Sequence, residues 1–171
     1  MSRRKAAISA RAQSLGPDLG RELSTWTILF HQAVAERLGL NVTDHKCLDF
    51  LGREGPVTAG RLAEVSGLTT GAVTGVIDRL ENASFVRRRE DPKDRRRVFI
   101  EPVPGAERRI GPLFASLRKE MGKMTSRFTD AQLDVIADFL QSSIDVMREE
   151  THRMRSASRL RSRKAGRPLD D

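Results

Sequence analysis

The sequence predicts a mainly α-helical fold that contains a winged helix-turn-helix, in which a β-hairpin follows two short helices. Three observations predict it. Apolar residues recur at spacings of three and four through most of the chain, which is typical of amphipathic helices. Two of these helices are separated only by the turn at residues 66–69, as in a helix-turn-helix. The helical period then gives way to two strand-like runs around a polar loop.

The first three helices follow from apolar periodicity and from residues that begin or end helices. A helix is expected over about residues 17–38, and Gly39 is expected to end it. Its apolar face consists of Leu19, Leu23, Trp26, Phe30, Val34 and Leu38. The second helix is expected to begin after Thr43, a suitable N-cap. A short third helix starts at Thr58 and is broken by the Ser-Gly pair at 66–67.

The fourth helix has one apolar face and one face of small or polar residues. Thr69 is its predicted N-cap. The apolar stripe, at spacing i, i+3, i+4, i+7, consists of Val73, Val76, Ile77 and Leu80. The opposite face consists of Thr70, Gly71, Thr74, Gly75, Asp78 and Arg79. Small and hydrogen-bonding groups let a helix approach base edges in a major groove, so this helix is a candidate recognition helix.

A hairpin and two longer helices are expected next. The strands are residues 85–89 and 97–101, and the polar loop between them contains the turn-forming Asp91-Pro92 pair. The fifth helix runs from about 106 to 124 and contains Pro112, which can kink it. The sixth follows a capping box formed by Thr129 and Gln132. Its apolar residues have near-heptad spacing, which favours another helix as partner: Leu133, Ile136, Leu140, Ile144 and Met147.

Positive charge is concentrated in three short segments of the chain. Residues 1–16, 86–97 and 153–171 carry +4, +4 and +5 of a net charge of +8, which leaves −5 for the remainder. Apolar residues nearly vanish from residue 153 on, so 153–171 are expected to form a basic disordered tail. This distribution indicates discrete contacts with a polyanion, most often nucleic acid. For the two ends of the chain, the alternative is that the charge only maintains solubility.

Several classes of protein are disfavoured by the composition. One cysteine, Cys47, cannot form an intramolecular disulfide. No apolar run is long enough to cross a membrane, and the first residues lack the apolar stretch of a signal peptide, so a cytoplasmic location is expected. The sequence offers no nucleophile–base arrangement, phosphate-binding glycine loop or paired carboxylates with clear roles. We therefore expect neither an enzyme nor a cofactor.

The segment 43–105 resembles the MarR family of transcription regulators. Three motifs carry the resemblance: Leu68-Thr69-Thr70-Gly71-Ala72-Val73-Thr74, Ile77-Asp78-Arg79-Leu80-Glu81 and Asp91-Pro92-Lys93-Asp94-Arg95-Arg96-Arg97. With the flanking helices it covers about residues 17–150. It implies a domain over 17–152, between a flexible basic arm at 1–16 and the basic tail. Within that domain it implies a winged helix at about 43–104, flanked by N- and C-terminal dimerisation helices at about 17–38 and 106–150.

The resemblance also implies a homodimer on double-stranded DNA, with each recognition helix in a major groove and a wing-tip arginine in the minor groove. On the helix it implies contacts from Thr69, Thr70, Gly71, Thr74 and Arg79. Thr69 is either a DNA contact or only a helix cap. Arg79 either holds a phosphate or pairs with Asp78 or Glu81, and Asp78 is expected to be a structural acid.

In the wing, the resemblance implies contacts from Arg88, Asp94, Arg95, Arg96 and Arg97. Arg96 is the expected minor-groove arginine, oriented by a salt bridge to Asp94, and Arg95 is the alternative. Three features depart from the family's pattern. After the wing, Pro102-Val103-Pro104-Gly105 stands where relatives usually have Leu-Thr before a glycine, so the hinge to the fifth helix is expected to be stiffer. Gly75 stands where many relatives have arginine, and because glycine inside a helix costs about 1 kcal/mol relative to alanine, a packing or docking reason is expected there. Ser84 stands where the family favours glycine, and it is strained if this turn requires a positive φ.

The family often senses small aromatic or phenolic compounds in a pocket between its DNA-binding part and its dimer helices. The candidate pocket residues here are Trp26, Phe30, His31, His45 and Phe114. The alternative is that the aromatic residues are ordinary core and the histidines lie on the surface. One hypothesis makes Cys47 a peroxide sensor, and another places it in a metal site with the histidines and Asp44 or Asp49. Its position on a packed helix face and the lack of a metal-binding motif argue against both, so no metal is expected.

These features predict a sequence-specific transcription regulator, a dimeric repressor released from a pseudo-palindromic operator by a small-molecule effector. The two half-sites would lie about one DNA turn apart. The alternative is an architectural DNA-binding protein that coats or bends DNA without an effector. A low ratio of specific to non-specific affinity would favour that alternative.

Overall fold

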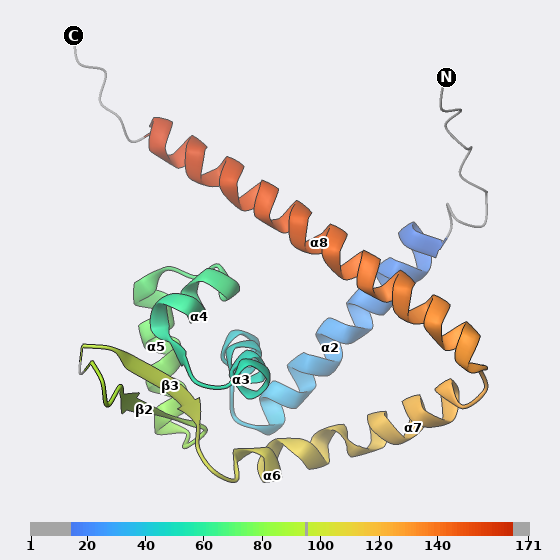
Figure 1. Ribbon diagram of the computed structural model, residues 1–171, viewed down its shortest axis with the longest axis horizontal. Helices are drawn as coiled ribbons and strands as arrows, with labels where there is room; N and C mark the ends of the chain where they lie inside the picture. The colour runs from blue at the N-terminus through green and yellow to red at the C-terminus, as the bar shows by residue number, and fades with distance from the viewer. Residues whose placement is uncertain (1–14, 95, 166–171) are drawn as a thin grey trace. The chain divides into compact units, whose positions relative to one another are not determined.

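Helices make up most of the chain in the computed structural model, which describes residues 15–94 and 96–165 (Figure 1). A small three-stranded sheet accompanies them, so the mainly helical winged fold is confirmed. Contacts divide the chain between Ala115 and Ser116 into two compact units. Most of the expected N-terminal arm, Arg95 and the end of the expected tail lie outside the described residues.

The first helices begin and end at residues with cap geometry. A π-helical segment, η1 (Leu15–Gly20), leads into α2 (Arg21–Arg37). Gly39 has a φ of +70° just beyond α2, which confirms it as the residue that ends this helix. The predicted cap of α3 (Val42–Glu54) was wrong. Asn41 caps this helix by accepting a 2.8 Å hydrogen bond from the Asp44 N–H, because residue 41 has the extended backbone that a cap requires and Thr43 is already helical.

The two helices of the helix-turn-helix are α4 (Ala59–Ser66) and α5 (Thr70–Asn82). The predicted cap Thr69 is confirmed, and Thr58, where the third helix was expected to start, is also a cap. The Thr58 hydroxyl accepts from the Arg61 N–H, and the Thr69 hydroxyl accepts from the Ala72 N–H, each at 3.3 Å. Gly67 adopts a left-handed conformation in the turn that joins them.

The sheet contains one strand more than the sequence predicts. Strands β2 (Val86–Glu90) and β3 (Val98–Pro102) form the expected hairpin, and β3 also pairs antiparallel with β1 (Val57–Thr58), which gives the order β1-β3-β2. The sequence could not predict β1, because two residues are too few to show an alternating apolar pattern. Only the pairing of these residues with β3 makes them a strand. β1 leads directly into α4 and so fixes the start of the helix-turn-helix against the hairpin.

The turn between α5 and β2 contains the strained residue that the sequence suggested. Ser84 has a φ of +57°, the one positive φ outside glycine in the described chain. Arg109 donates to the carbonyl oxygen of Ala83 at 2.9 Å, and its guanidinium lies 3.8 Å from the centre of the Phe85 ring. These contacts hold the turn in place and seat the fully buried Phe85.

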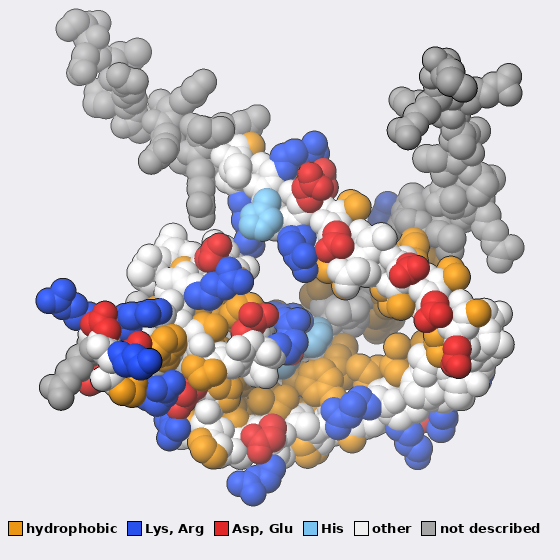
Figure 2. Space-filling model, in the orientation of Figure 1, with side chains coloured by type: hydrophobic (Ala, Val, Ile, Leu, Met, Phe, Trp, Pro, Cys, Tyr) orange, Lys and Arg blue, Asp and Glu red, His pale blue; other side chains and the backbone are white. Residues whose placement is uncertain are grey.

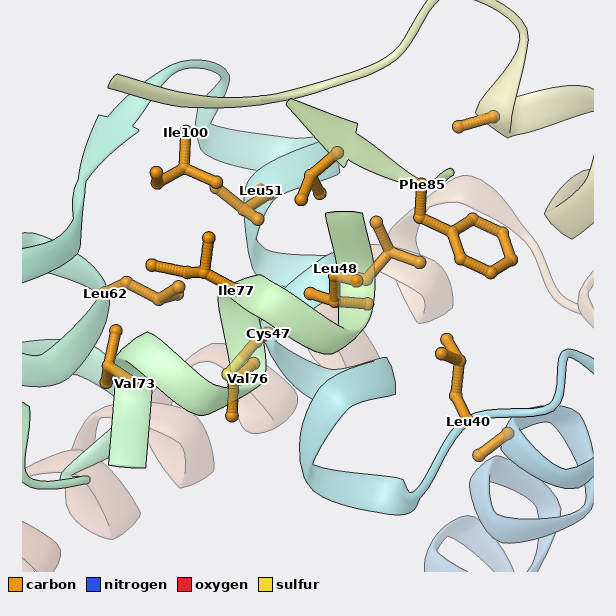
Figure 3. Close-up of a cluster of buried hydrophobic side chains, with 14 residues drawn as sticks. Leu40, Cys47, Leu48, Leu51, Leu62, Val73, Val76, Ile77, Phe85 and Ile100 are labelled. Atoms are coloured by element: carbon orange, nitrogen blue, oxygen red, sulfur yellow. The ribbon is translucent and has the colours of Figure 1, made fainter. Parts of the chain in front are cut away.

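The core of the first unit gathers apolar side chains from α3, α4, α5 and the sheet (Figure 3). The predicted stripe of α5 is confirmed, because all four of its members are at most 2% exposed: Val73, Val76, Ile77 and Leu80. They pack with Leu51 of α3, Leu62 of α4 and Ile100 of β3. Burying one face of α5 in this way leaves its opposite face to solvent.

The predicted fifth helix is divided into three parts at Pro112. These are α6 (Ala106–Ile110), a 3₁₀ segment η2 (Gly111–Phe114) and α7 (Ala115–Thr125). Proline lacks an N–H and clashes with the preceding turn, so the helix tightens into 3₁₀ geometry there.

The last helix, α8 (Asp130–Ala165), is longer than expected. Its predicted capping box is confirmed, since Gln132 Oε1 accepts from the Thr129 N–H and Thr129 Oγ1 accepts from the Gln132 N–H. The expectation of disorder from residue 153 differs from the structure, in which the backbone stays helical to Ala165. No glycine or proline interrupts this stretch before Gly166, and Arg153 pairs with Glu150 one turn earlier. Among the described residues, no helix has the length and apolar character needed to cross a membrane.

Candidate nucleic-acid interface

The exposed face of α5 carries the residues that the sequence assigned to it. Thr70, Gly71 and Thr74 are exposed on the side opposite the buried stripe. The Thr74 hydroxyl donates to the Thr70 carbonyl oxygen at 3.1 Å, so its oxygen remains able to accept a hydrogen bond from outside. Thr69 acts as the cap of α5 and is exposed. This face is therefore small, polar and free of bulky side chains at its N-terminal end.

Arg79, at the other end of α5, is held by an acid that the sequence did not pair with it. Its Nε and Nη2 donate to the two carboxylate oxygens of Asp44 in α3, each at 2.7 Å. The expected partners Asp78 and Glu81 were wrong. The Asp44 carboxylate is almost fully buried, whereas about half of the Arg79 side chain is exposed. This bidentate pair joins α5 to α3 and raises the pKa of Arg79, first through the hydrogen bond itself.

Gly75 lies next to this ion pair, which gives the packing reason that its position required. A Cβ atom at residue 75 would lie 3.3 Å from Nη1 of Arg79. The Arg79 guanidinium would have to move by a few tenths of an ångström to make room for that atom. Glycine at this position therefore accommodates the link between α5 and α3.

Three arginines of strand β2 are paired with acids of the protein. Arg88 forms ion pairs with Asp78 and Glu81 of α5, which confirms Asp78 as a structural acid. Arg87 and Arg89 both bind Glu101 of β3, at 2.7 and 2.8 Å. Hydrogen bonds from Arg89 and then Arg87 lower the pKa of Glu101. These pairs stiffen the hairpin and attach it to α5, and they occupy charge that would otherwise be available to DNA.

The wing tip is shaped by two aspartates and carries exposed cations. Asp91 Oδ1 accepts from the Lys93 N–H and Asp94 Oδ1 accepts from the Arg96 N–H, so both carboxylates shape the loop through the backbone. The expected salt bridge from Asp94 to the Arg96 guanidinium is replaced by this backbone contact. Within the described residues, the side chains of Lys93 and Arg96 have no acidic partner.

Of the other two predicted arginines of the wing, the structure describes Arg97 but not Arg95. Arg97 is exposed, and its guanidinium lies 5.5 Å from the centre of the Phe99 ring. Arg95 lies outside the described residues. Lys and Arg side chains crowd around the β2–β3 hairpin, at the left of Figure 2. The hairpin thus carries a cluster of positive charge beyond its internal ion pairs.

Four of the five predicted pocket residues lie together in the first unit. The Phe30 and Phe114 rings meet edge to face, and the His31 and His45 rings lie beside Phe114. Nδ1 of His31 and Nε2 of His45 are 3.2 Å apart, within hydrogen-bond distance. His45 is buried, and among the described residues its Nδ1 has no hydrogen-bond partner. Trp26 does not join this cluster, since 63% of its side chain is exposed.

Acidification should destabilise the folded protein through this histidine pair. Burial lowers the pKa of both His31 and His45 below the usual value for histidine, and the charge of the neighbouring His31 adds to the effect on His45. Below about pH 6.5 the unfolded chain binds more protons than the folded chain, so the free energy of unfolding falls as the pH falls. Urea unfolding at pH 7.5 and 5.5 measures this loss. Replacing both histidines with glutamine should flatten the dependence, and an unchanged dependence would assign it to other groups.

Cys47 is buried in the core, and burial raises the pKa of its thiol to about 11. A thiol in this environment is protonated at neutral pH and is a poor nucleophile, which argues against the peroxide-sensor hypothesis. Among the described residues, no group of three or more His, Cys, Asp or Glu is placed to hold a metal ion.

Comparison with known proteins agrees with this geometry. The MarR family model matches residues 40–98. The uncharacterized HTH-type transcriptional regulator YcgE of Bacillus subtilis is 44% identical over 137 residues, which are 80% of this chain and 89% of that protein. Transcriptional regulator Tm0710 of Thermotoga maritima is 25% identical, with a TM-score of 0.55 over 78% of this chain and 94% of its own. An S. aureus MepR mutant bound to an oligodeoxyribonucleotide is 16% identical, with a TM-score of 0.53 over 75% and 95%.

Proposed function

The chain belongs to the MarR family of transcription regulators, which are not enzymes, and on that premise we propose that it is a dimeric repressor released from a pseudo-palindromic operator by a small-molecule effector. One observation carries the proposal. The arginines of strand β2 form ion pairs within the protein. Lys93 and Arg96 at the wing tip, and the small polar face of α5, are exposed and available to an external partner.

These two surfaces suit two different parts of a DNA duplex. The exposed Thr70, Gly71 and Thr74 allow α5 to lie close to base edges in a major groove. The long, exposed side chain of Arg96 suits the negative potential of a narrow minor groove, and Lys93 suits a phosphate. Of the other predicted contacts, we assign the exposed Thr69 and Arg97 to phosphates that flank these sites.

Dimerisation is supported by apolar faces that the chain does not bury. Along η1 and α2 the exposed apolar residues include Leu19 of η1 and Leu23 and Trp26 of α2, at 59%, 64% and 63% exposure. On α8 they include Ile136, Phe139, Leu140, Ile144 and Met147. Exposed apolar surface of this kind is typical of an interaction site. A second copy of the chain would bury these faces in a symmetric interface. A pseudo-palindromic operator then matches the two-fold symmetry of the dimer.

Replacing Leu140 and Ile144 with aspartate should convert the dimer into monomers, because the change places charges in the apolar face of α8. Sedimentation velocity measures the mass, and circular dichroism checks that the helices persist. The matched control is Ala137→Asp together with Gln141→Asp, which adds the same two charges at exposed positions outside the apolar stripe of α8. The control should remain dimeric. A dimer that persists in the Leu140 and Ile144 variant would place the interface elsewhere.

The aromatic–histidine cluster supports an effector site for a small aromatic or phenolic compound. Phe30 and Phe114 offer ring faces and edges, and the unpartnered Nδ1 of the buried His45 offers a hydrogen bond to a hydroxyl or carboxylate group. An effector that binds better to a dimer with unsuitable recognition-helix spacing would release DNA by shifting the population of conformations.

Binding to the DNA just upstream of the protein's own gene tests this proposal. The assay is a footprint at ~150 mM salt with excess non-specific competitor, since non-specific binding weakens steeply with salt. We expect a discrete footprint with two half-sites about one turn apart, and phenolic compounds can then be screened for release. Binding that disappears under competitor at every sequence tested would favour the architectural protein. The basic segments near the two ends of the chain are the observation that favours this architectural function.

A further inference from the structure

A groove between α3 and α4 is separate from both the DNA-facing surface and the aromatic–histidine cluster. It has a volume of about 430 Å³, within the range of small-molecule sites. The buried Cys47 and Leu62 form its floor, and the half-buried Phe50 and Val65 line its walls. The interior of the groove is therefore largely apolar, with room for a small hydrophobic body.

The rim of this groove is positively charged. Lys46 and Arg53 of α3 both line it. Among the described residues, Arg53 forms one ion pair, with Asp49 at 3.4 Å, and because 71% of the Arg53 side chain is exposed this pair is weak. Partial burial lowers the pKa of Lys46, the charge of Asp49 raises it and the charge of Arg53 lowers it. An anion placed between Lys46 and Arg53 would relieve the repulsion between the two cations.

The groove lies on a different face of α3 from the histidine cluster. Thr43, Lys46, Phe50 and Arg53 follow one another at spacings of three and four, which places them along one side of the helix. His45 is rotated from Lys46 by about 100° and points to the other cluster. No residue of the aromatic–histidine cluster lines the groove.

We propose that this groove is a second ligand site of the protein, for a small amphipathic anion: a carboxylate carried on an apolar body. The apolar body lies on Cys47, Leu62 and Val65, and the carboxylate lies between Lys46 and Arg53. An alkyl chain and an aromatic ring supply the same chemistry, so both are included in the test. Because α4 is the first helix of the helix-turn-helix, this site lies within the DNA-binding element itself.

Calorimetric titration of the full-length protein with octanoate and with naphthoate tests the site. Octanamide and naphthamide are neutral controls of nearly the same shape. We expect at least one carboxylate to bind about tenfold more tightly than its amide, the value of one charge-assisted contact. Replacing Lys46 and Arg53 with glutamine should remove that difference. Lys123→Gln with Arg148→Gln changes the net charge equally at exposed positions of α7 and α8, and it should leave binding unchanged.

Amide chemical shifts of the same protein locate the ligand. Shifts concentrated at Lys46, Phe50 and Val65 support the groove. Shifts concentrated at Phe30, His45 and Phe114 would overturn it in favour of the aromatic–histidine cluster. Equal binding of carboxylate and amide, or a Lys46 and Arg53 variant that binds as tightly as the natural chain, would also overturn it. None of these measurements involves DNA, so they are independent of the proposed repressor function.

Discussion

Replacing Arg79 with methionine should lower the midpoint of thermal unfolding by about 5–10 °C, because it leaves the buried carboxylate of Asp44 without its ionic partner. Methionine keeps much of the length of the arginine stem, so the change removes the charge with little loss of packing. Differential scanning calorimetry measures the midpoint. A shift of less than about 2 °C would mean that water or another donor satisfies Asp44 equally well.

A double-mutant cycle separates the structural role of Arg79 from a role in DNA binding. Asp44→Leu together with Arg79→Met removes both charges, and the double variant should be more stable than Arg79→Met alone. If Arg79 acts by holding α5 against α3, operator affinity should recover along with stability. Recovered stability with persistently weak operator binding would instead assign Arg79 a direct contact with a DNA phosphate.

Replacing Arg96 with alanine should weaken operator binding by about tenfold at ~150 mM salt and reduce the salt dependence by about one unit of slope. The physical reason is that Arg96 is exposed at the wing tip with no acidic partner among the described residues, so its charge is available to DNA. Fluorescence anisotropy over a series of salt concentrations measures both quantities.

The matched control for Arg96 is Arg87→Ala, which removes the same charge from the same hairpin. Arg87 is held by Glu101 at 2.7 Å, so its loss should change operator affinity by no more than about twofold. Equal losses in the two variants would show that the wing acts as a diffuse basic surface. That outcome would favour the architectural alternative over the sequence-specific repressor.

Most of the helical architecture was predictable because local chemistry determines it. Thr58, Thr69 and the Thr129–Gln132 pair cap helices through contacts within three residues. Gly39 ends α2, and the spacing of apolar residues in α5 predicted which face is buried. The cap of α3 was misassigned since Asn41 and Thr43 are both good caps by residue type, and the choice depends on where the backbone becomes extended.

The sequence predicted which residues form the candidate site, but not which of its arginines form ion pairs with acids of the protein. The basic residues of the wing and the polar face of α5 were identified from the sequence, as was the cluster of Phe30, His31, His45 and Phe114. The charge pattern could not distinguish a free arginine from one held by an acid. Asp44 in particular gave no signal of its role, because its partner lies 35 positions away along the chain.

The sequence by itself determined that this protein is helical, that it carries a helix-turn-helix with a basic wing, and which faces of its helices are apolar. Those properties follow from periodicity and capping, which act over a few residues. Only the tertiary structure decided which basic residues form ion pairs within the protein: Arg79, Arg87, Arg88 and Arg89. It also decided that Lys93 and Arg96 are exposed and available to a partner. An ion pair depends on the distance between two charges in space, and that distance is set when the helices and the sheet pack together.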